Sequence, residues 1–271
     1  MNKYDIIAEM NDSTVVTEYK PQTTKSDAYQ SEADLEKEFI RLLQEQSYEY
    51  LNIHQESDLV LNIRKQLEYL NDFKFTDDEW KRFFSNSIGN PNNGIVEKTR
   101  IIQEDYVQVL KKDDGTSKNI YLIDKKNIHK NKLQVINQYV NNEWKLDNRY
   151  DVAILVNGLP LVHVELKRRG VAIKEAFNQI ERYQRDSFWA GLGLYEFIQI
   201  FVISNGTNTK YYSNSTRFNH IKNTTTKGAK EKTSNSFEFT SYWADANNKV
   251  ISDLVDFTKT FFSKHTILNI L

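Results

Sequence analysis

The chain has 271 residues, of which 39% are hydrophobic and 13% aromatic, so its composition favours a folded globular protein over a disordered one. Its formal net charge of −1 gives no whole-chain attraction to nucleic acid, so any such contact must come from a local surface. It has no cysteine, which excludes disulfides and thiolate sites, and no apolar run near the ~20 residues that span a bilayer, so we expect no membrane contact and a cytoplasmic location.

The amino-terminal third is predicted to be mainly helical after a polar arm. Residues 1–28 are polar apart from a β-branched segment at Thr14–Thr17, and they predict an arm or an edge strand. Ser31 is a candidate helix N-cap with an acid three residues later, and apolar residues then follow at helical spacing. Two more helices are expected, over 59–70 and from a cap at Thr76 until Asn90-Pro-Asn-Asn-Gly94 breaks the pattern.

Strand patterns become frequent in the second part of the chain. Residues 101–110 are ambiguous, whereas Asp113-Asp-Gly115 is typical of a turn and Asn119–Asp124 of a strand. Further strands are expected at 133–140, 150–156, 159–167, 196–203 and around 211–212 and 237–239, and helices at 172–187 and 249–263. This alternation predicts one α/β core.

The hairpin over residues 150–167 carries the strongest chemical signal. Asp151 opens its first strand, and Glu165 and Lys167 end its second strand, so two carboxylates and a lysine converge at one end. Two carboxylates suit a hard divalent cation with vacant positions for water and a phosphate oxygen, and a lysine can polarise the water or stabilise the phosphate. The pattern favours a metal-dependent phosphodiesterase over a surface strand whose Glu and Lys form a solvated pair.

The length of the hairpin turn decides whether the two carboxylates can share a metal. A two-residue turn at Asn157–Gly158 would place Asp151 and Glu165 on opposite faces of the sheet. We therefore predict one extra residue, as a bulge or as a three-residue turn over Val156–Gly158 in which Asp151 faces His163 and Glu165 lies diagonally on the same face. Whether His163 borders the site or only packs beside it stays open.

The helix after the hairpin places Gln179 and Tyr183 four residues apart on one face, next to Glu175 and Arg182. An amide and a phenol there could orient a phosphate or a DNA strand. The alternative is that the tyrosine belongs to the apolar stripe of an amphipathic helix.

Two other searches bear on function. The basic runs Lys167–Arg169 and Lys222–Lys232 are candidates for DNA contact, although the second is also typical of a solvated loop. The chain has no phosphate-cradling loop for ATP, and its histidines lack the spacing of a zinc site.

Together, Asp151, Glu165-Leu-Lys167 and Gln179-x-x-x-Tyr183 resemble the PD-(D/E)XK nuclease superfamily. The segment from Asn148 to Tyr183 resembles the R subunit of type I restriction enzymes. The resemblance extends to 29–36, 124–127, 201–207 and 264–269, and it points to the type IC branch. It implies a restriction-endonuclease-like α/β core, with a mixed central sheet flanked by helices, as an endonuclease domain over 29–271 after the arm.

The resemblance also implies roles for individual residues. Asp151 and Glu165 would bind Mg²⁺, and Lys167 would assist the attacking water. Gln179 and Tyr183 would support cleavage and DNA contact, and Glu32 would add an acid from the first helix, with Glu36 as the alternative. The one departure is Tyr150, which stands where the family pattern has proline.

The same resemblance implies a larger assembly around this domain. The family's R subunit continues into C-terminal motor domains that use ATP to translocate double-stranded DNA, so the chain is expected to be a fragment that binds no ATP itself. Specificity and methyltransferase subunits would be its partners. Two alternatives stay open, namely a nuclease-fold docking or DNA-binding module, and a PD-(D/E)XK nuclease of a repair or modification-dependent system.

Overall fold

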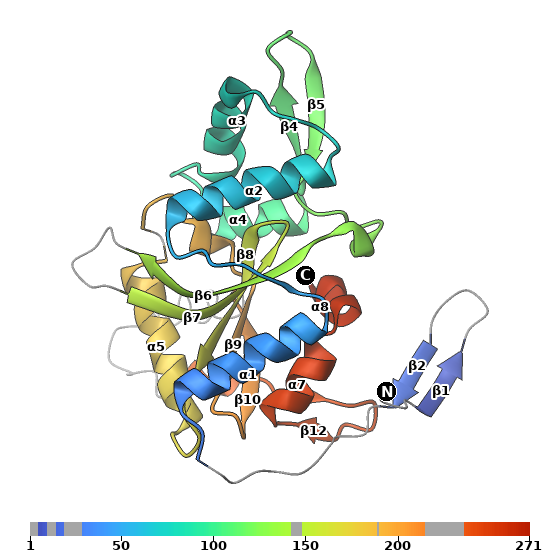
Figure 1. Cartoon of the computed structure of the whole chain (residues 1–271), viewed down its shortest axis with the longest axis vertical. Helices are drawn as coiled ribbons and strands as arrows, with labels where there is room; N and C mark the ends of the chain where they lie inside the picture. Colours follow the sequence, from blue (N-terminus) through green and yellow to red (C-terminus); the bar gives the residue numbers. More distant parts are fainter. Residues whose placement is uncertain (1–4, 10–14, 19–28, 142–147, 189, 215–235) are drawn as a thin grey trace, which may run out of the picture.

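The computed structural model describes residues 5–9, 15–18, 29–141, 148–188, 190–214 and 236–271. At its centre is a six-stranded mixed sheet in the order β10-β9-β8-β7-β6-β3, in which β8 runs parallel to β9, β3 runs parallel to β6 and the other neighbours are antiparallel (Figure 1). The strands are β3 (Glu49–Tyr50), β6 (Leu133–Asn141), β7 (Asn148–Val156), β8 (Leu159–Leu166), β9 (Ile200–Ser204) and β10 (Thr209–Ser213). The expected mixed sheet is thus confirmed.

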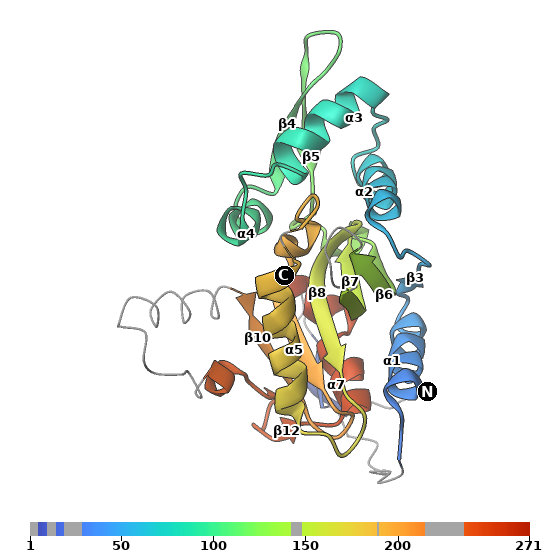
Figure 2. The same cartoon turned by 90° about the vertical axis from the view of Figure 1, so that its left-hand side faces the viewer.

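Helices cover both faces of this sheet (Figures 1 and 2). α5 (Ile173–Asp186) packs against β8 and β9 and connects these two parallel strands. α1 (Glu32–Glu45) and α7 (Leu254–Phe261) pack together on the other side, and α8 (Lys264–Ile270) follows. Ser31 caps α1 as predicted, because its side chain accepts a hydrogen bond from the Asp34 backbone.

A second group of elements lies above the sheet in Figure 1 and contains most of the predicted amino-terminal helices. These elements are α2 (Glu56–Leu70), α3 (Asp77–Phe83), η1 (Phe84–Ile88), α4 (Ile95–Gln103), β4 (Val107–Lys111) and β5 (Ser117–Tyr121). Thr76 and Glu79 form a capping box at the start of α3. The ring of Phe75, which precedes the helix, packs against the rings of Trp80 and Phe83 on it. Their side chains are continuous with the core of the central sheet.

The amino-terminal arm contains a small hairpin of its own. β1 (Asp5–Glu9) and β2 (Val15–Glu18) pair with each other in a two-stranded sheet. β2 coincides with the β-branched segment of the arm, although it does not join the edge of the central sheet. The boundary between the arm and the rest of the chain at residue 28 stays a prediction.

Several expected elements differ in the structure. Residues 237–239 lie in the 3₁₀ turn η4 (Ser236–Phe239) and not in a strand, because the Phe237 and Phe239 rings pack against Phe177 of α5. The last expected helix begins only at Leu254, after β11 (Trp243–Ala244) and β12 (Val250–Ile251), and it is split into α7 and α8. η3 (Leu194–Phe197) replaces the start of the strand expected from 196. The basic run 222–232 lies outside the described residues.

The ambiguous segment around 101–110 separates into the end of α4 and the start of β4.

None of the helices in the described ranges combines the length and the apolar character that a bilayer crossing needs.

Candidate active site

The hairpin that carries the candidate residues has a regular two-residue turn. Asn157 and Gly158 both adopt left-handed backbone angles, with φ values of 50° and 85°, and Val156 pairs with Leu159. The predicted three-residue turn is therefore wrong. The turn is tightly confined, because a Cβ atom on Gly158 would lie 2.7 Å from the Cα atom of Ile63 in α2.

The alternative prediction, a bulge, is confirmed, and it lies within β8. The pairing of β7 with β8 shifts by one residue shortly after the turn, which makes Leu161 the additional residue. Continuing this register places Asp151 directly opposite Glu165 on one face of the sheet. The expected register with Asp151 facing His163 is wrong, because His163 pairs with Ala153.

The two carboxyl groups lie beside each other in a largely dry environment. Glu165 is fully buried, whereas Asp151 is partly exposed and its Oδ2 atom accepts a hydrogen bond of 2.9 Å from the Leu166 backbone. Burial, followed by the charge of Glu165, raises the pKa of Asp151 to about 8. Burial raises the pKa of Glu165 to about 7, although the Lys167 ammonium acts in the opposite direction. The site is therefore too negative when both groups are ionised.

This carboxylate pair fits a hard divalent cation. Mg²⁺ prefers carboxylate oxygen ligands, and a cation would relieve the burial and repulsion that raise both pKa values. Across the described ranges, no group of three or more His, Cys, Asp or Glu side chains could hold a metal ion. The chain would thus supply two carboxylate ligands and leave the other positions to water and substrate, which is common for Mg²⁺.

Lys167 lies beside the carboxylate pair and connects it to α1. Its Nζ atom donates hydrogen bonds to Glu165 Oε1 at 3.2 Å and to the Leu166 carbonyl at 3.1 Å. Glu32, at the first position of α1, brings its Oε2 atom to 3.9 Å from the same Nζ atom, and its side chain is half exposed. Glu32 therefore lies close enough to pair with the lysine, and its role as an additional acid of the site stays a prediction.

Glu36, the alternative acid on α1, is occupied elsewhere. It is largely buried and accepts hydrogen bonds from the side-chain amides of Asn137, at 2.6 Å, and Gln138. Gln138 lies on β6 opposite Asp151 and has a left-handed φ of 54°, which is uncommon for a residue other than glycine. Its side-chain oxygen accepts a hydrogen bond from Arg149. Sequence reasoning missed Gln138, since no pattern marks a glutamine for this conformation.

Gln179 and Tyr183 are joined as their spacing predicts. The Gln179 amide donates a hydrogen bond to the Tyr183 hydroxyl, which itself donates to the Arg149 carbonyl at 2.9 Å. Tyr183 is buried, and burial raises the pKa of its hydroxyl further above its ordinary value. The tyrosine therefore belongs to the apolar stripe of the helix, because its ring packs in the core while its hydroxyl holds the Gln179 amide. The role of the two residues in orienting a phosphate or a DNA strand stays a prediction.

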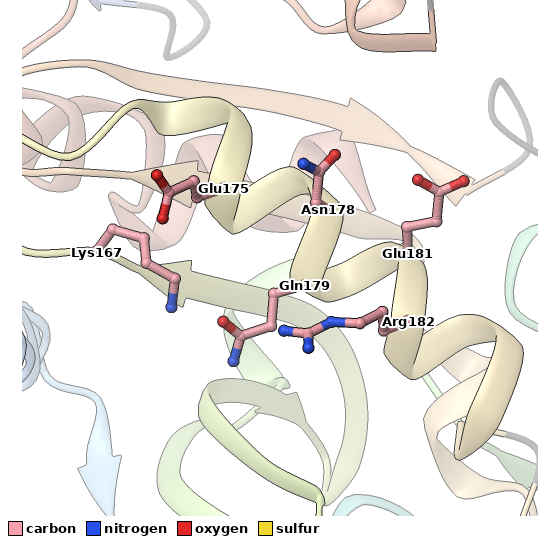
Figure 3. Close-up of a pocket in the computed structure, with 6 residues that line it drawn as sticks. All are labelled: Lys167, Glu175, Asn178, Gln179, Glu181 and Arg182. Atoms are coloured by element: carbon pink, nitrogen blue, oxygen red, sulfur yellow. The ribbon is translucent and has the colours of Figure 1, made fainter. Parts of the chain in front are cut away.

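An open pocket of about 410 Å³ lies between the end of β8 and α5. It is lined by Lys167, Glu175, Asn178, Gln179, Glu181 and Arg182. Figure 3 shows the polar ends of Lys167, Gln179 and Arg182 on the same side of α5, while Asn178 and Glu181 point to the other side. The lining thus combines two cations, two amides and two carboxylates, and its Lys167 edge adjoins Glu165. Its cations and amides can donate hydrogen bonds to an anionic ligand.

Comparisons with known proteins agree on one family. The model of the type I restriction enzyme R protein N terminus matches residues 29–220. The chain is 48% identical, over 98% of its length, to the type I restriction enzyme EcoprrI endonuclease subunit of Escherichia coli, of which it covers 80%. It is 37% identical, over 89% of its length, to the SsaAORF53P endonuclease subunit of Staphylococcus saprophyticus.

Another relative is the SauMSSORF170P endonuclease subunit of Staphylococcus aureus, which is 37% identical over 86% of this chain. The chain spans only 25% and 23% of the lengths of these two Staphylococcus proteins, so it matches one part of each of them. The matched range contains every residue of the candidate site. The chain therefore belongs to the family of type I restriction enzyme R protein amino-terminal regions.

Proposed function

We propose that this chain is a Mg²⁺-dependent endonuclease domain that hydrolyses phosphodiester bonds in double-stranded DNA. The observation that carries the proposal is the direct opposition of Asp151 and Glu165 on one face of the sheet, with Lys167 in contact with Glu165. The relatives are also named as endonuclease subunits of type I restriction enzymes.

In this proposal each of the three residues has a distinct role. Asp151 and Glu165 hold the cation, and Mg²⁺ bound there would lower the pKa of a water molecule and neutralise charge on the phosphate. Lys167 already uses two hydrogen bonds to anchor its ammonium group at the site. An ammonium group has three donors, so the third is available for the attacking water or a phosphate oxygen.

Substrate binding would depend on the phosphate backbone. Lys167, Gln179 and Arg182 border one pocket, and such groups bind phosphate oxygens without reporting the base sequence. Tyr183 contributes by fixing Gln179. We therefore propose a nuclease that cuts without reading sequence.

In the full-length subunit, we propose that ATP-driven DNA translocation by C-terminal motor domains brings DNA to this site. Specificity and methyltransferase subunits would complete the assembly in the cytoplasm, and ATP would bind to the motor and not to this chain. The type IC assignment stays a prediction.

The test is cleavage of plasmid DNA by the assembled enzyme with Mg²⁺ and ATP. Asp151→Ala, Glu165→Ala and Lys167→Ala are each expected to abolish cleavage while assembly and ATP hydrolysis persist. Lys174→Ala, which removes an exposed lysine at the start of α5, serves as the control and should cleave normally. Normal cleavage by Asp151→Ala would refute the assignment. Cation binding without nicking by any assembly would instead favour a docking or DNA-binding module.

A further inference from the structure

His163 lies beneath the carboxylate pair, on the buried side of Glu165. Its side chain has no exposed surface. Four aromatic rings approach it edge to face, with centroid distances from 5.5 to 6.3 Å, and they belong to Tyr150, Tyr183, Phe188 and Phe201. An apolar side chain would satisfy these neighbours as well as an imidazole does, so packing alone does not explain a histidine here.

The imidazole makes one polar contact. Its Nε2 atom lies 3.3 Å from Glu165 Oε2, whereas its Nδ1 atom is buried and has no hydrogen-bond partner among the described residues. If the proton were on Nδ1, a buried N–H group would be left unpaired, which is rare and costly. A proton on Nε2 is donated to a carboxylate, and Nδ1 then keeps only a lone pair. The contact therefore assigns the proton to Nε2.

The surroundings of the imidazole fit its neutral form, which has one N–H group and one lone pair. The ring is fully buried among aromatic side chains, with Nε2 beside a carboxylate oxygen and Nδ1 without a hydrogen-bond partner among the described residues. A neutral donor is useful next to a carboxylate that must bind a cation, since it orients the carboxylate without competing for its charge.

The two oxygen atoms of Glu165 are thus held by two different residues. Oε1 accepts from Lys167, and Oε2 accepts from His163. Two hydrogen bonds on separate oxygen atoms fix the rotation of the carboxylate plane, which a single contact would leave free. The fixed carboxylate stays beside Asp151, where a shared cation would need it.

We propose that His163 is a positioning residue that orients the Glu165 carboxylate for cation binding through its Nε2–H group. The proposal rests on the proposed function, because it assumes that Asp151 and Glu165 hold the cation. It does not require His163 to touch the cation or the DNA.

The test is the affinity of the 271-residue chain for Mn²⁺, measured by calorimetry in the absence of DNA. His163→Leu keeps the apolar packing and removes the donor, so its Mn²⁺ affinity should fall by about 10- to 100-fold. His163→Gln keeps an N–H group at a similar reach and should retain most of the affinity. Phe188→Leu is the matched packing control, since it disturbs the same cluster without touching Glu165, and should bind Mn²⁺ as the wild type does.

Cleavage by the assembled enzyme gives a second readout. His163→Leu should need more Mg²⁺ for half-maximal cleavage and should recover much of its rate when Mg²⁺ is saturating. An equal loss of affinity in His163→Gln and Phe188→Leu would show that only packing matters and would overturn the proposal. Wild-type affinity in His163→Leu, alongside lost binding in Asp151→Ala, would also overturn it but leave the proposed function intact. If the wild type binds no Mn²⁺ and cuts no DNA, both proposals are wrong.

A measurement on the wild type covers the case in which His163→Leu does not fold. Nitrogen-15 NMR of the metal-free chain reports which imidazole nitrogen carries the proton. We expect the proton on Nε2. A proton on Nδ1 would remove the donor from Glu165 and contradict the proposal.

Discussion

Two buried charged sites in this molecule are built in opposite ways. Lys98 of α4 has 1% of its surface exposed, and its Nζ atom donates to the carbonyls of Gly193, at 2.7 Å, and Leu192, at 3.3 Å. Glu196 lies 3.6 Å from it and the Phe197 ring lies beneath it at 5.2 Å. Every donor of this ammonium group thus has a partner, and the site serves to join α4 to η3.

The carboxylate pair is the contrasting case. When both are ionised, Asp151 and Glu165 carry like charges side by side, and Lys167 is the cation that contacts the pair within the part of the chain that the structure describes. A buried charged group whose donors all have partners can serve to hold the fold together. Two buried carboxylates that repel each other are instead suited to binding a cation that neutralises them. We therefore expect the Lys98 site to stabilise the fold and the carboxylate pair to bind a cation, and four measurements can distinguish these two roles.

The largest effect is expected for Asp151→Asn, which acts in opposite directions on activity and stability. The assembled enzyme should lose detectable cleavage, because one proposed cation ligand is gone. The metal-free chain should gain at least about 1 kcal/mol in unfolding free energy at pH 8, because the repulsion is removed while an oxygen remains to accept from Leu166. Urea unfolding in the presence of a chelator measures this gain. A clear loss of stability would show that the pair is structural.

Lys98→Met should show the reverse behaviour. Methionine keeps the volume of the side chain but removes the donor from the Leu192 carbonyl, one of two donors from the Gly193 carbonyl and the cation from Glu196, so the unfolding free energy should fall by about 3–5 kcal/mol. Lys81→Met, at an exposed position of α3, is the control and should change stability by less than about 0.5 kcal/mol. A stability change as small as that of the control would mean that this buried lysine contributes little.

The carboxylate pair should also make the free energy of unfolding depend on pH. The pKa values of Asp151 and Glu165 are raised to about 8 and about 7, so the folded chain retains protons that the unfolded chain has released. This contribution to stability is present at low pH and is lost as pH rises from about 4 towards 8. Mg²⁺ should therefore stabilise the chain more at pH 8.5 than at pH 6, as measured by urea unfolding. Asp151→Asn should reduce that difference, and an unchanged difference would contradict the assignment.

The smallest effect is expected at Glu32. Its side chain is half exposed and lies 3.9 Å from Lys167 Nζ, so Glu32→Gln should change cleavage by less than about fivefold, the range of a weak exposed ion pair. The assay is plasmid cleavage at several Mg²⁺ concentrations. A complete loss of cleavage would instead make Glu32 a third ligand and enlarge the site.

Local sequence patterns correctly predicted the elements that depend on a few neighbouring residues. The N-cap at Ser31, the capping box at Thr76 and the helix containing Gln179 are all where spacing predicts them. Asp151, Glu165 and Lys167 could be grouped because side chains alternate between the two faces of a strand, which is a local property. The same alternation required one extra residue in the hairpin, and the structure has that residue in β8.

Contacts between distant segments account for what the sequence could not reveal. The bulge lies at Leu161 and not in the turn, and the turn itself packs closely against Ile63 of α2, which is far from it in the sequence. The segment at 237–239 is no strand, since its phenylalanines pack against α5. The alternation of side chains along a strand predicted that His163 shares the face of Glu165. The structure adds that the imidazole is enclosed by rings and has Glu165 as its hydrogen-bond partner among the described residues.

The confined hairpin turn has a consequence for the chemical ageing of the protein. In an Asn-Gly sequence the glycine nitrogen readily attacks the asparagine side chain, and the product inserts an extra carbon into the backbone. Here the Asn157 side chain is buried, donates to the Leu122 carbonyl and to Asn131, and accepts from the Lys132 backbone, so the folded chain resists this attack. Conversion at Asn157 should therefore record time spent unfolded, and peptide mapping should find it after incubation in urea but not after equal storage in buffer.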